Sequence, residues 1–136
     1  MSHRSRLAGF IIDCNVDDLD AAAAFWSGAL GLPIADPNAG DGSSEYQQFG
    51  GTPADLQIEV QKVDHPSRVH LDIESDDIDA EALRLEALGA KRLGFLKRWW
   101  VMEAPTGQRF CVVRPQRADF ATQANVWEEG KGQPGG

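Results

Sequence analysis

The sequence IDCNVDDLDA at residues 12–21 recurs in altered form as LDIESDDIDA at residues 71–80. Each copy continues through a segment with helical spacing and closes on a Leu-Gly pair, at 30–31 in the first copy and at 88–89 in the second. A repeat of this length is longer than a typical solenoid unit and indicates a duplicated half-domain. We therefore expect two similar halves, in which each residue can be compared with its counterpart.

The first half is predicted to begin with a strand followed by a helix. The strand is the apolar run at 10–14, and Asp17 or Asp18 can cap a helix whose apolar residues recur at helical spacing. Gly31 supplies a C-cap for that helix. The remaining segments are a loop at 36–44 and strands at 45–49 and 56–63.

The second half repeats this order. A strand at 68–74 leads into a helix that Asp76 or Asp77 can cap and that ends at Gly89. Further strands are expected at 91–96, 99–103 and 108–114, a helical segment at 118–128 that docks Phe120 and Trp127, and a disordered tail at 131–136. The predicted fold class is α+β, with two β-α-β-β-β modules in a pseudo-two-fold arrangement. We expect one domain over 1–130, with repeats at about 7–63 and 68–115.

Polar and apolar side chains alternate along the predicted strands, so each strand has one face toward its helix and one face away from it. The side chains expected on the face away from the helices are Ile11, Asp13, Asn15, Gln57, Glu59, Gln61, His70, Asp72, Glu74, Arg109, Cys111 and Val113. Two curved sheets joined edge to edge would form a trough lined by these residues. Such a trough is the expected binding site.

Composition excludes several classes of partner. The formal net charge of −8 over 136 residues argues against nucleic acid and against an anionic membrane surface. The sequence has no apolar run long enough for a membrane span, and its basic start is not followed by a signal-peptide pattern. We expect a cytoplasmic protein, in which Cys14 and Cys111 are reduced thiols.

The sequence resembles the vicinal oxygen chelate superfamily, which includes glyoxalase I, extradiol dioxygenases and bleomycin-resistance proteins. It looks closest to the glyoxalase-like single-domain proteins of bacteria, from about residue 7 to residue 115. The motifs that carry the resemblance are DLD at 18–20, FW at 25–26, LGL at 30–32, VHLD at 69–72, LGA at 88–90, WVM at 100–102, PTG at 105–107 and FCVV at 110–113. No single motif is specific, but their order on a duplicated pattern is typical of this fold. The fold itself hosts unrelated chemistries.

The resemblance implies one metal ligand on each of four trough strands, at Ile11, Glu59, His70 and Cys111. Ile11 cannot coordinate a metal, and the apolar neighbours of Cys111 favour a small buried side chain. A catalytic site normally keeps at least three protein ligands. We therefore favour no metal cofactor; if a divalent metal ion is present, Glu59 and His70 are the expected ligands.

The resemblance and the residues together favour a protein that binds a small molecule in the trough without a metal. The residues expected to line the site are His70, Glu59, Asp72, Cys111 and one of Trp99 and Trp100. A tryptophan beside carboxylates would suit a cationic or aromatic ligand. The resemblance also implies a homodimer.

Other roles for the same residues stay open. One alternative is a metal-dependent lyase, isomerase or dioxygenase that uses Glu59, His70 and, as a further ligand, Cys111. Another is metal-free acid/base catalysis by His70 with Glu59. His70 could also have a structural role, hydrogen-bonded to Asp72 or to Glu59.

Overall fold

The computed structural model describes residues 2–35 and 45–128, and the chain forms two compact units. The first unit is Gly9–His70, and the second combines Met1–Ala8 with Leu71–Gly136. Strands β1 (His3–Cys14) and β4 (Arg68–Ser75) each pass from one unit into the other. The expected tail at 131–136 and the expected loop at 36–44 lie outside the described residues.

The first unit has the strand order β2-β3-β1, with β2 at Tyr46–Gln48 and β3 at Gln57–Lys62. β3 runs parallel to β1 and places Glu59 opposite Ile11, while β2 runs antiparallel to β3. A short 3-10 turn at Pro53–Asp55 precedes β3. An isolated bridge joins Ile34 to Phe49, the residue directly after β2.

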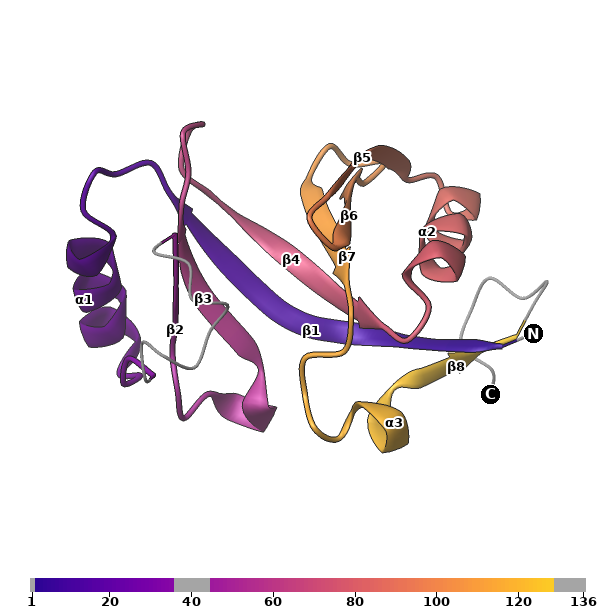
Figure 1. Ribbon diagram of the computed structural model, residues 1–136, viewed down its shortest axis with the longest axis horizontal. Helices are drawn as coiled ribbons and strands as arrows, with labels where there is room; N and C mark the ends of the chain where they lie inside the picture. The colour runs from indigo at the N-terminus through magenta and orange to yellow at the C-terminus, as the bar shows by residue number, and fades with distance from the viewer. Residues whose placement is uncertain (1, 36–44, 129–136) are drawn as a thin grey trace. The chain divides into compact units, whose positions relative to one another are not determined.

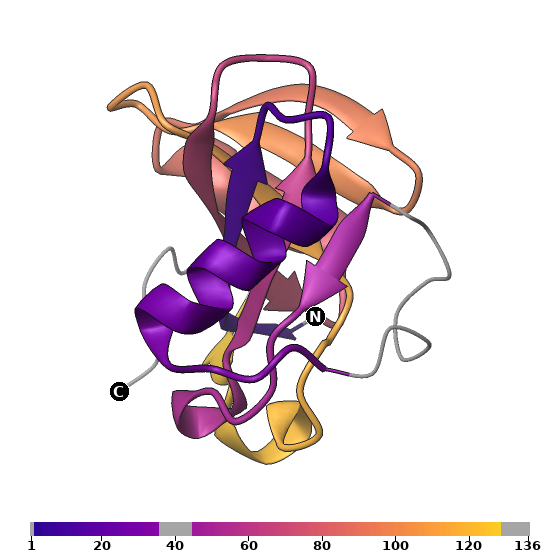
Figure 2. The same cartoon turned by 90° about the vertical axis from the view of Figure 1, so that its left-hand side faces the viewer.

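Helix α1 (Leu19–Leu30) covers one face of the first unit's strands (Figure 2). The Asp18 carboxylate accepts a hydrogen bond from the backbone N–H of Ala21, and Gly31 ends the helix with φ of 69°. Both caps agree with the sequence-based expectation. The first unit's core consists of Ile12, Cys14, Leu19, Ala23, Phe49, Ile58 and Val60. Since Ile12 and Cys14 face the helix, alternation directs Ile11 and Asp13 to the other face.

The second unit has the order β1-β4-β7-β6-β5, with β8 paired to β1. Its later elements are α2 (Ile78–Ala87), β5 (Lys91–Leu96), β6 (Trp99–Glu103), β7 (Arg109–Val113), α3 (Phe120–Gln123) and β8 (Asn125–Trp127). Figure 1 shows α2 beside β5, β6 and β7. Its apolar side packs on Met102 and Val112, which are fully buried. The predicted β-α-β-β-β order of this half is confirmed by β4, α2, β5, β6 and β7.

Two buried glutamates tie the second unit together. Glu74 accepts hydrogen bonds from Arg6 Nε at 2.7 Å and from Arg117 Nε at 3.0 Å. Glu81 accepts from Ser5 Oγ at 2.7 Å, lies 2.8 Å from His3 Nε2 and is also paired with Arg84. Glu74 was expected on the trough face near the ligand. It is fully buried, and Arg6 and Arg117 neutralise its charge, which is the usual condition for a buried charge.

The segment after β7 is helical only in its first part. α3 covers Phe120–Gln123, whereas β8 at Asn125–Trp127 is a strand rather than the end of the expected helix. Pairing with β1 explains this correction, because Trp127 lies opposite His3 and donates from Nε1 to Ser5 Oγ at 2.7 Å. Phe120 and Trp127 are both buried, as expected.

The α+β class predicted from sequence is confirmed: eight strands and three α-helices occur within the described residues. Across those same residues, no helix has the length and apolar character that would let it cross a bilayer.

Candidate functional site

His70 is held by a carboxylate that the sequence did not assign to it. In the first unit, His70 Nδ1 lies 2.8 Å from Asp13 Oδ2. Because a carboxylate accepts hydrogen bonds, Nδ1 carries the proton and the lone pair of the neutral ring lies on Nε2. Asp13 is a partner of His70 that was not among those expected for a structural role, which were Asp72 and Glu59. A histidine held in this way is oriented for metal binding or for acid/base chemistry through Nε2.

Asp13 is itself buried, with 2% of its surface exposed. Besides His70, its Oδ2 lies 3.7 Å from Arg68 Nε, and the Arg68 side chain is partly exposed. The alternation of β1 placed Asp13 on the same face as Ile11, so the sequence contained the signal for this contact. In the repeat, Asp13 corresponds to Asp72, which was expected to line the site, but no partner for Asp13 was predicted.

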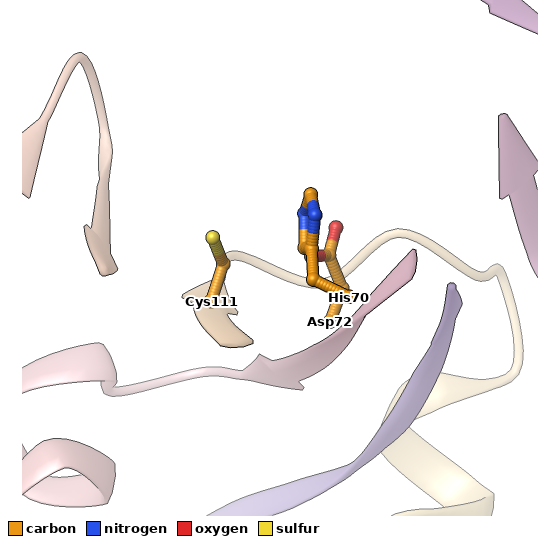
Figure 3. Close-up of side chains that lie close together, drawn as sticks. All are labelled: His70, Asp72 and Cys111. Carbon is orange, nitrogen blue, oxygen red and sulfur yellow. The ribbon is translucent and has the colours of Figure 1, made fainter. Parts of the chain in front are cut away.

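His70 belongs to a group of three possible metal-binding side chains with Asp72 and Cys111 (Figure 3). His70 and Asp72 are two residues apart on β4 and therefore share a face, and Asp72 is the register partner of Cys111 on β7. One ligand atom from each residue lies within 4.8 Å of the others. Three of the residues predicted for the site are therefore brought together.

Among the described residues, the group of possible metal ligands does not include Glu59. Its Oε1 accepts hydrogen bonds from Gln48 Nε2 at 2.8 Å and from Gln57 Nε2 at 3.0 Å. It is also buried, with 7% exposure. The two amides stabilise the Glu59 carboxylate within the strands of the first unit, and the sequence did not indicate these contacts.

The four positions implied for a metal do not form a hard-metal site. Ile11 is a buried hydrocarbon with 3% exposure, and Glu59 accepts hydrogen bonds from two amides. The group of His70, Asp72 and Cys111 offers one nitrogen, one oxygen and one sulfur. Such a set suits a borderline ion such as Zn²⁺ better than an ion that prefers oxygen ligands, such as Mn²⁺.

The two neighbouring tryptophans of β6 have different environments. Trp100 Nε1 donates to Asp79 Oδ1 on α2 at 2.8 Å, and its ring packs against the second unit's core. Arg92 lies over the same ring, 4.7 Å from its centroid. Trp100 is therefore on the helix side of its unit, and alternation directs Trp99 to the opposite face. If one of the two tryptophans contacts a ligand, we expect it to be Trp99.

The two cysteines also differ. Cys14 is buried in the first unit's core, and Cys111 is partly buried. Burial raises the pKa of the Cys14 thiol above its ordinary value of 9.0, and the negative charge of Asp13 raises it further. Cys14 is therefore a neutral core thiol at neutral pH.

The element order defines a mixed α+β domain. Its strands carry the polar group of His70, Asp72 and Cys111. The sequence pattern of the glyoxalase-like domain matches residues 9–113, and the chain belongs to that family. None of the curated proteins compared with the chain matches it.

Two solved structures show the same fold. The manganese-bound glyoxalase from Novosphingobium aromaticivorans is 19% identical, with a TM-score of 0.54 over 87% of this chain. The chain spans 44% of that protein's length. A hypothetical protein from Bacillus halodurans C-125 is 13% identical, with a TM-score of 0.52, and the match covers 83% of this chain and 97% of that one. At these identities the likeness establishes the fold alone.

Proposed function

We propose that this glyoxalase-like protein binds a small molecule at His70, Asp72 and Cys111 without a metal ion. The observation that carries the proposal is the hydrogen bond from His70 Nδ1 to Asp13, which fixes the ring and directs the Nε2 lone pair away from that carboxylate. A histidine oriented by a buried carboxylate can recognise a hydrogen-bond donor on a ligand. Trp99 is the aromatic candidate for contact with a cationic or aromatic part of the ligand.

The donor chemistry supports binding without a metal. Of the four implied ligand positions, Ile11 has no donor atom and Glu59 is engaged by Gln48 and Gln57. The alternative of a metal-dependent lyase, isomerase or dioxygenase based on Glu59 and His70 is therefore not favoured. The group of His70, Asp72 and Cys111, which offers nitrogen, oxygen and sulfur ligands, is the remaining candidate site for a metal ion. Its metal content is measured directly.

Elemental analysis of protein purified without chelators is the direct test for a metal. We expect less than stoichiometric metal in the wild type and the same content in His70→Ala, Asp72→Asn and Cys111→Ser. Near-stoichiometric Zn²⁺ that is lost in all three variants would overturn the metal-free proposal. The matched control is Cys14→Ser, which removes a thiol outside the group.

Ligand binding itself is tested by tryptophan fluorescence against a panel of aromatic and cationic small molecules. We expect ligands that bind the wild type to lose affinity by about tenfold or more in His70→Asn, because a hydrogen-bonding ring is replaced. The control variant is His65→Asn, since His65 is a second histidine of the first unit that contacts Pro66 and Arg68. Equal loss in both variants would contradict a specific role of His70.

A second candidate function is metal-free acid/base catalysis, favoured by the same Asp13–His70 pair. A histidine oriented by a buried carboxylate is a recurrent general base. In this candidate function, Asp13 is the partner of His70, whereas the sequence had led us to expect Glu59 in that role. Turnover of a bound ligand that is abolished in His70→Asn and reduced in Asp13→Asn would favour catalysis over binding alone.

We also propose that the protein is a cytoplasmic homodimer. Large apolar side chains are exposed in the second unit, including Leu71 at 51% and Phe95 at 53%. Exposed apolar surface of this kind supports association with a second copy. Sedimentation equilibrium at several protein concentrations measures the association state. A monomer at all concentrations would contradict this part of the proposal.

A further inference from the structure

Helix α1 has an outer face without charged side chains. Its single charged residue is Asp20, whose carboxylate accepts a hydrogen bond from Gln47 Nε2. The residues exposed along the outer side of the helix are Ala21, Ala24, Phe25, Gly28 and Ala29. The outer face of a helix on a protein surface normally carries charged or polar residues, whereas an apolar helix face is normally covered.

The counterpart of α1 in the repeat is α2, and its composition is different. Charged side chains occur along α2 at Asp79, Glu81, Arg84 and Glu86. The alignment of the two copies places Arg84 where α1 has Phe25, and Glu81 where α1 has Ala22. The apolar outer face is therefore a property of the first helix and not of the repeated module.

The second unit covers the corresponding flank of α2 with an aromatic side chain. Arg84 lies over the ring of Trp127, 3.7 Å from its centroid, and Trp127 is buried. In the first unit, the flank of α1 at Ala22 and Phe25 borders a pocket instead. The comparison of the two halves indicates that this flank of α1 suits an aromatic side chain.

The pocket has a volume of about 420 Å³, which is larger than a phenyl ring. Phe25 borders it, meets Trp26 edge to face with ring centroids 5.1 Å apart, and is 64% exposed. One surface thus presents both an exposed aromatic side chain and a pocket that can receive one. The apolar side chains that line the pocket include those of Ile12, Val16, Ala22, Trp26 and Val69.

We propose that the outer side of α1 is the interface between two copies of this chain. The two α1 helices pack antiparallel across a two-fold axis, and Phe25 of each copy enters the pocket of the other. A surface with both a projecting side chain and a pocket for it is self-complementary, as a two-fold interface requires. The small residues Ala21, Ala24 and Gly28 allow close approach of the helices. The inference rests on the homodimer proposed above and not on the ligand site at His70.

The charge of the chain favours this surface for a second copy. The formal net charge is −8, so two copies repel each other least where they meet across an uncharged face. An antiparallel arrangement also keeps the two acidic helix starts, at 17–20, away from each other. In the second unit, by contrast, the exposed apolar side chains of β5 lie between two basic pairs, at 91–92 and 97–98.

Sedimentation equilibrium of the full-length protein and its variants tests the interface. Phe25→Glu should raise the dissociation constant of the dimer by about 100-fold or more, because it removes the inserted ring and places two like charges in an apolar interface. Leu83→Glu is the matched control, since Leu83 is 63% exposed on α2 and corresponds to Ala24 in the repeat. Equal dissociation constants for the wild type and Phe25→Glu would overturn the assignment.

A second pair of variants tests the pocket without adding charge. Ala22→Leu fills part of the pocket and should weaken the dimer by about tenfold or more, since Phe25 of the other copy then has less room. Ala87→Leu, on the exposed end of α2, should dimerise like the wild type. Circular dichroism shows whether each variant is folded. An unchanged dimer in folded Ala22→Leu would contradict the insertion of Phe25.

The outcomes also separate this inference from the homodimer proposed above. A wild type that is monomeric at all concentrations would overturn both. A dimer that dissociates in Phe95→Glu but persists in Phe25→Glu would retain the homodimer and place its interface in the second unit, against the assignment to α1. Dissociation in Phe25→Glu with a stable dimer in Phe95→Glu supports the interface at α1.

Discussion

The Asp13 carboxylate and the His70 imidazole are 57 residues apart in sequence and 2.8 Å apart in the first unit. Asp13 lies next to the last residue of β1, and His70 is the third residue of β4. The contact assigns the proton to Nδ1 of the ring. It is the relationship on which both candidate activities at His70 depend.

The first prediction concerns the tautomer of His70. Wild-type protein should show His70 protonated at Nδ1 in its neutral form, because Asp13 accepts that hydrogen bond. Asp13→Ala removes the acceptor and should populate the tautomer protonated at Nε2. Nitrogen-15 NMR of the imidazole rings measures this, with Asp17→Ala as a control on an exposed carboxylate. An unchanged His70 tautomer in Asp13→Ala would show that another group holds the ring.

The second prediction concerns stability in acid. Burial pushes the pKa of Glu81 upward, but hydrogen bonds from Arg84, His3 and Ser5 outweigh it and lower the pKa below its ordinary value of 4.5. The stabilisation is therefore complete above pH 4.5 and is lost as the pH falls through the lower, folded-state pKa. The free energy of unfolding should fall steadily with pH in that range.

Glu81→Gln tests this origin of the acid dependence. The variant should lose about 1–3 kcal/mol at pH 7, because the charged hydrogen bonds are replaced by neutral ones. Its free energy of unfolding should also depend less on pH below 4.5 than that of the wild type. Urea unfolding at several pH values measures both effects, and Glu86→Gln serves as a control on an exposed ion pair. Parallel pH profiles for the wild type and Glu81→Gln would contradict the assignment.

The third prediction concerns the cysteines. Cys14 should react with iodoacetamide more slowly than Cys111, because Cys14 is buried and its thiol pKa is raised by burial and by Asp13. Mass spectrometry of the folded protein at pH 8 measures the two rates. Both thiols should react at similar rates in denaturant, and faster modification of Cys14 in the folded state would count against the described core.

The fourth prediction concerns Gly9. A Cβ atom at this position would lie 1.9 Å from the backbone oxygen of Gln57, so the parallel pair of β1 and β3 has no room for a side chain. Gly9→Ala should lower the free energy of unfolding by about 1–3 kcal/mol or more. Gly28→Ala is the matched control in α1, where the added methyl meets no atom within 4 Å. The control should raise stability by about 0.5–1 kcal/mol, since alanine favours a helix.

Much of the fold could be predicted because its signals are local. Period-two alternation identified the strands, and the aspartate caps and Gly31 bounded the helices within a residue or two. The start of β1 was missed, since residues 3–9 are rich in charged and small side chains. Their strand conformation depends on distant partners, such as Glu81 for Ser5.

The site could be predicted only in part for the same reason. His70, Asp72 and Cys111 came from alternation and from the family resemblance, and the structure brings them together. Alternation placed Asp13 on the same face as His70, but their contact also depends on the pairing of distant segments, which the sequence does not specify by itself. The amides that engage Glu59 are likewise ordinary polar residues until β2 and β3 are paired.

The division of β1 and β4 between the two units has a consequence for synthesis. The second unit needs the first eight residues together with residues from Leu71 onward, so it is not contiguous in the chain. During translation, all of the first unit leaves the ribosome before the second unit's remaining strands emerge. The first residues of β1 have no partners until residues more than sixty positions later have emerged, since Ser5 pairs with Glu81 and Trp127. Co-translational folding should accordingly start with Gly9–His70, and ribosome-bound chains long enough for residue 70 to have left the exit tunnel should protect that unit first.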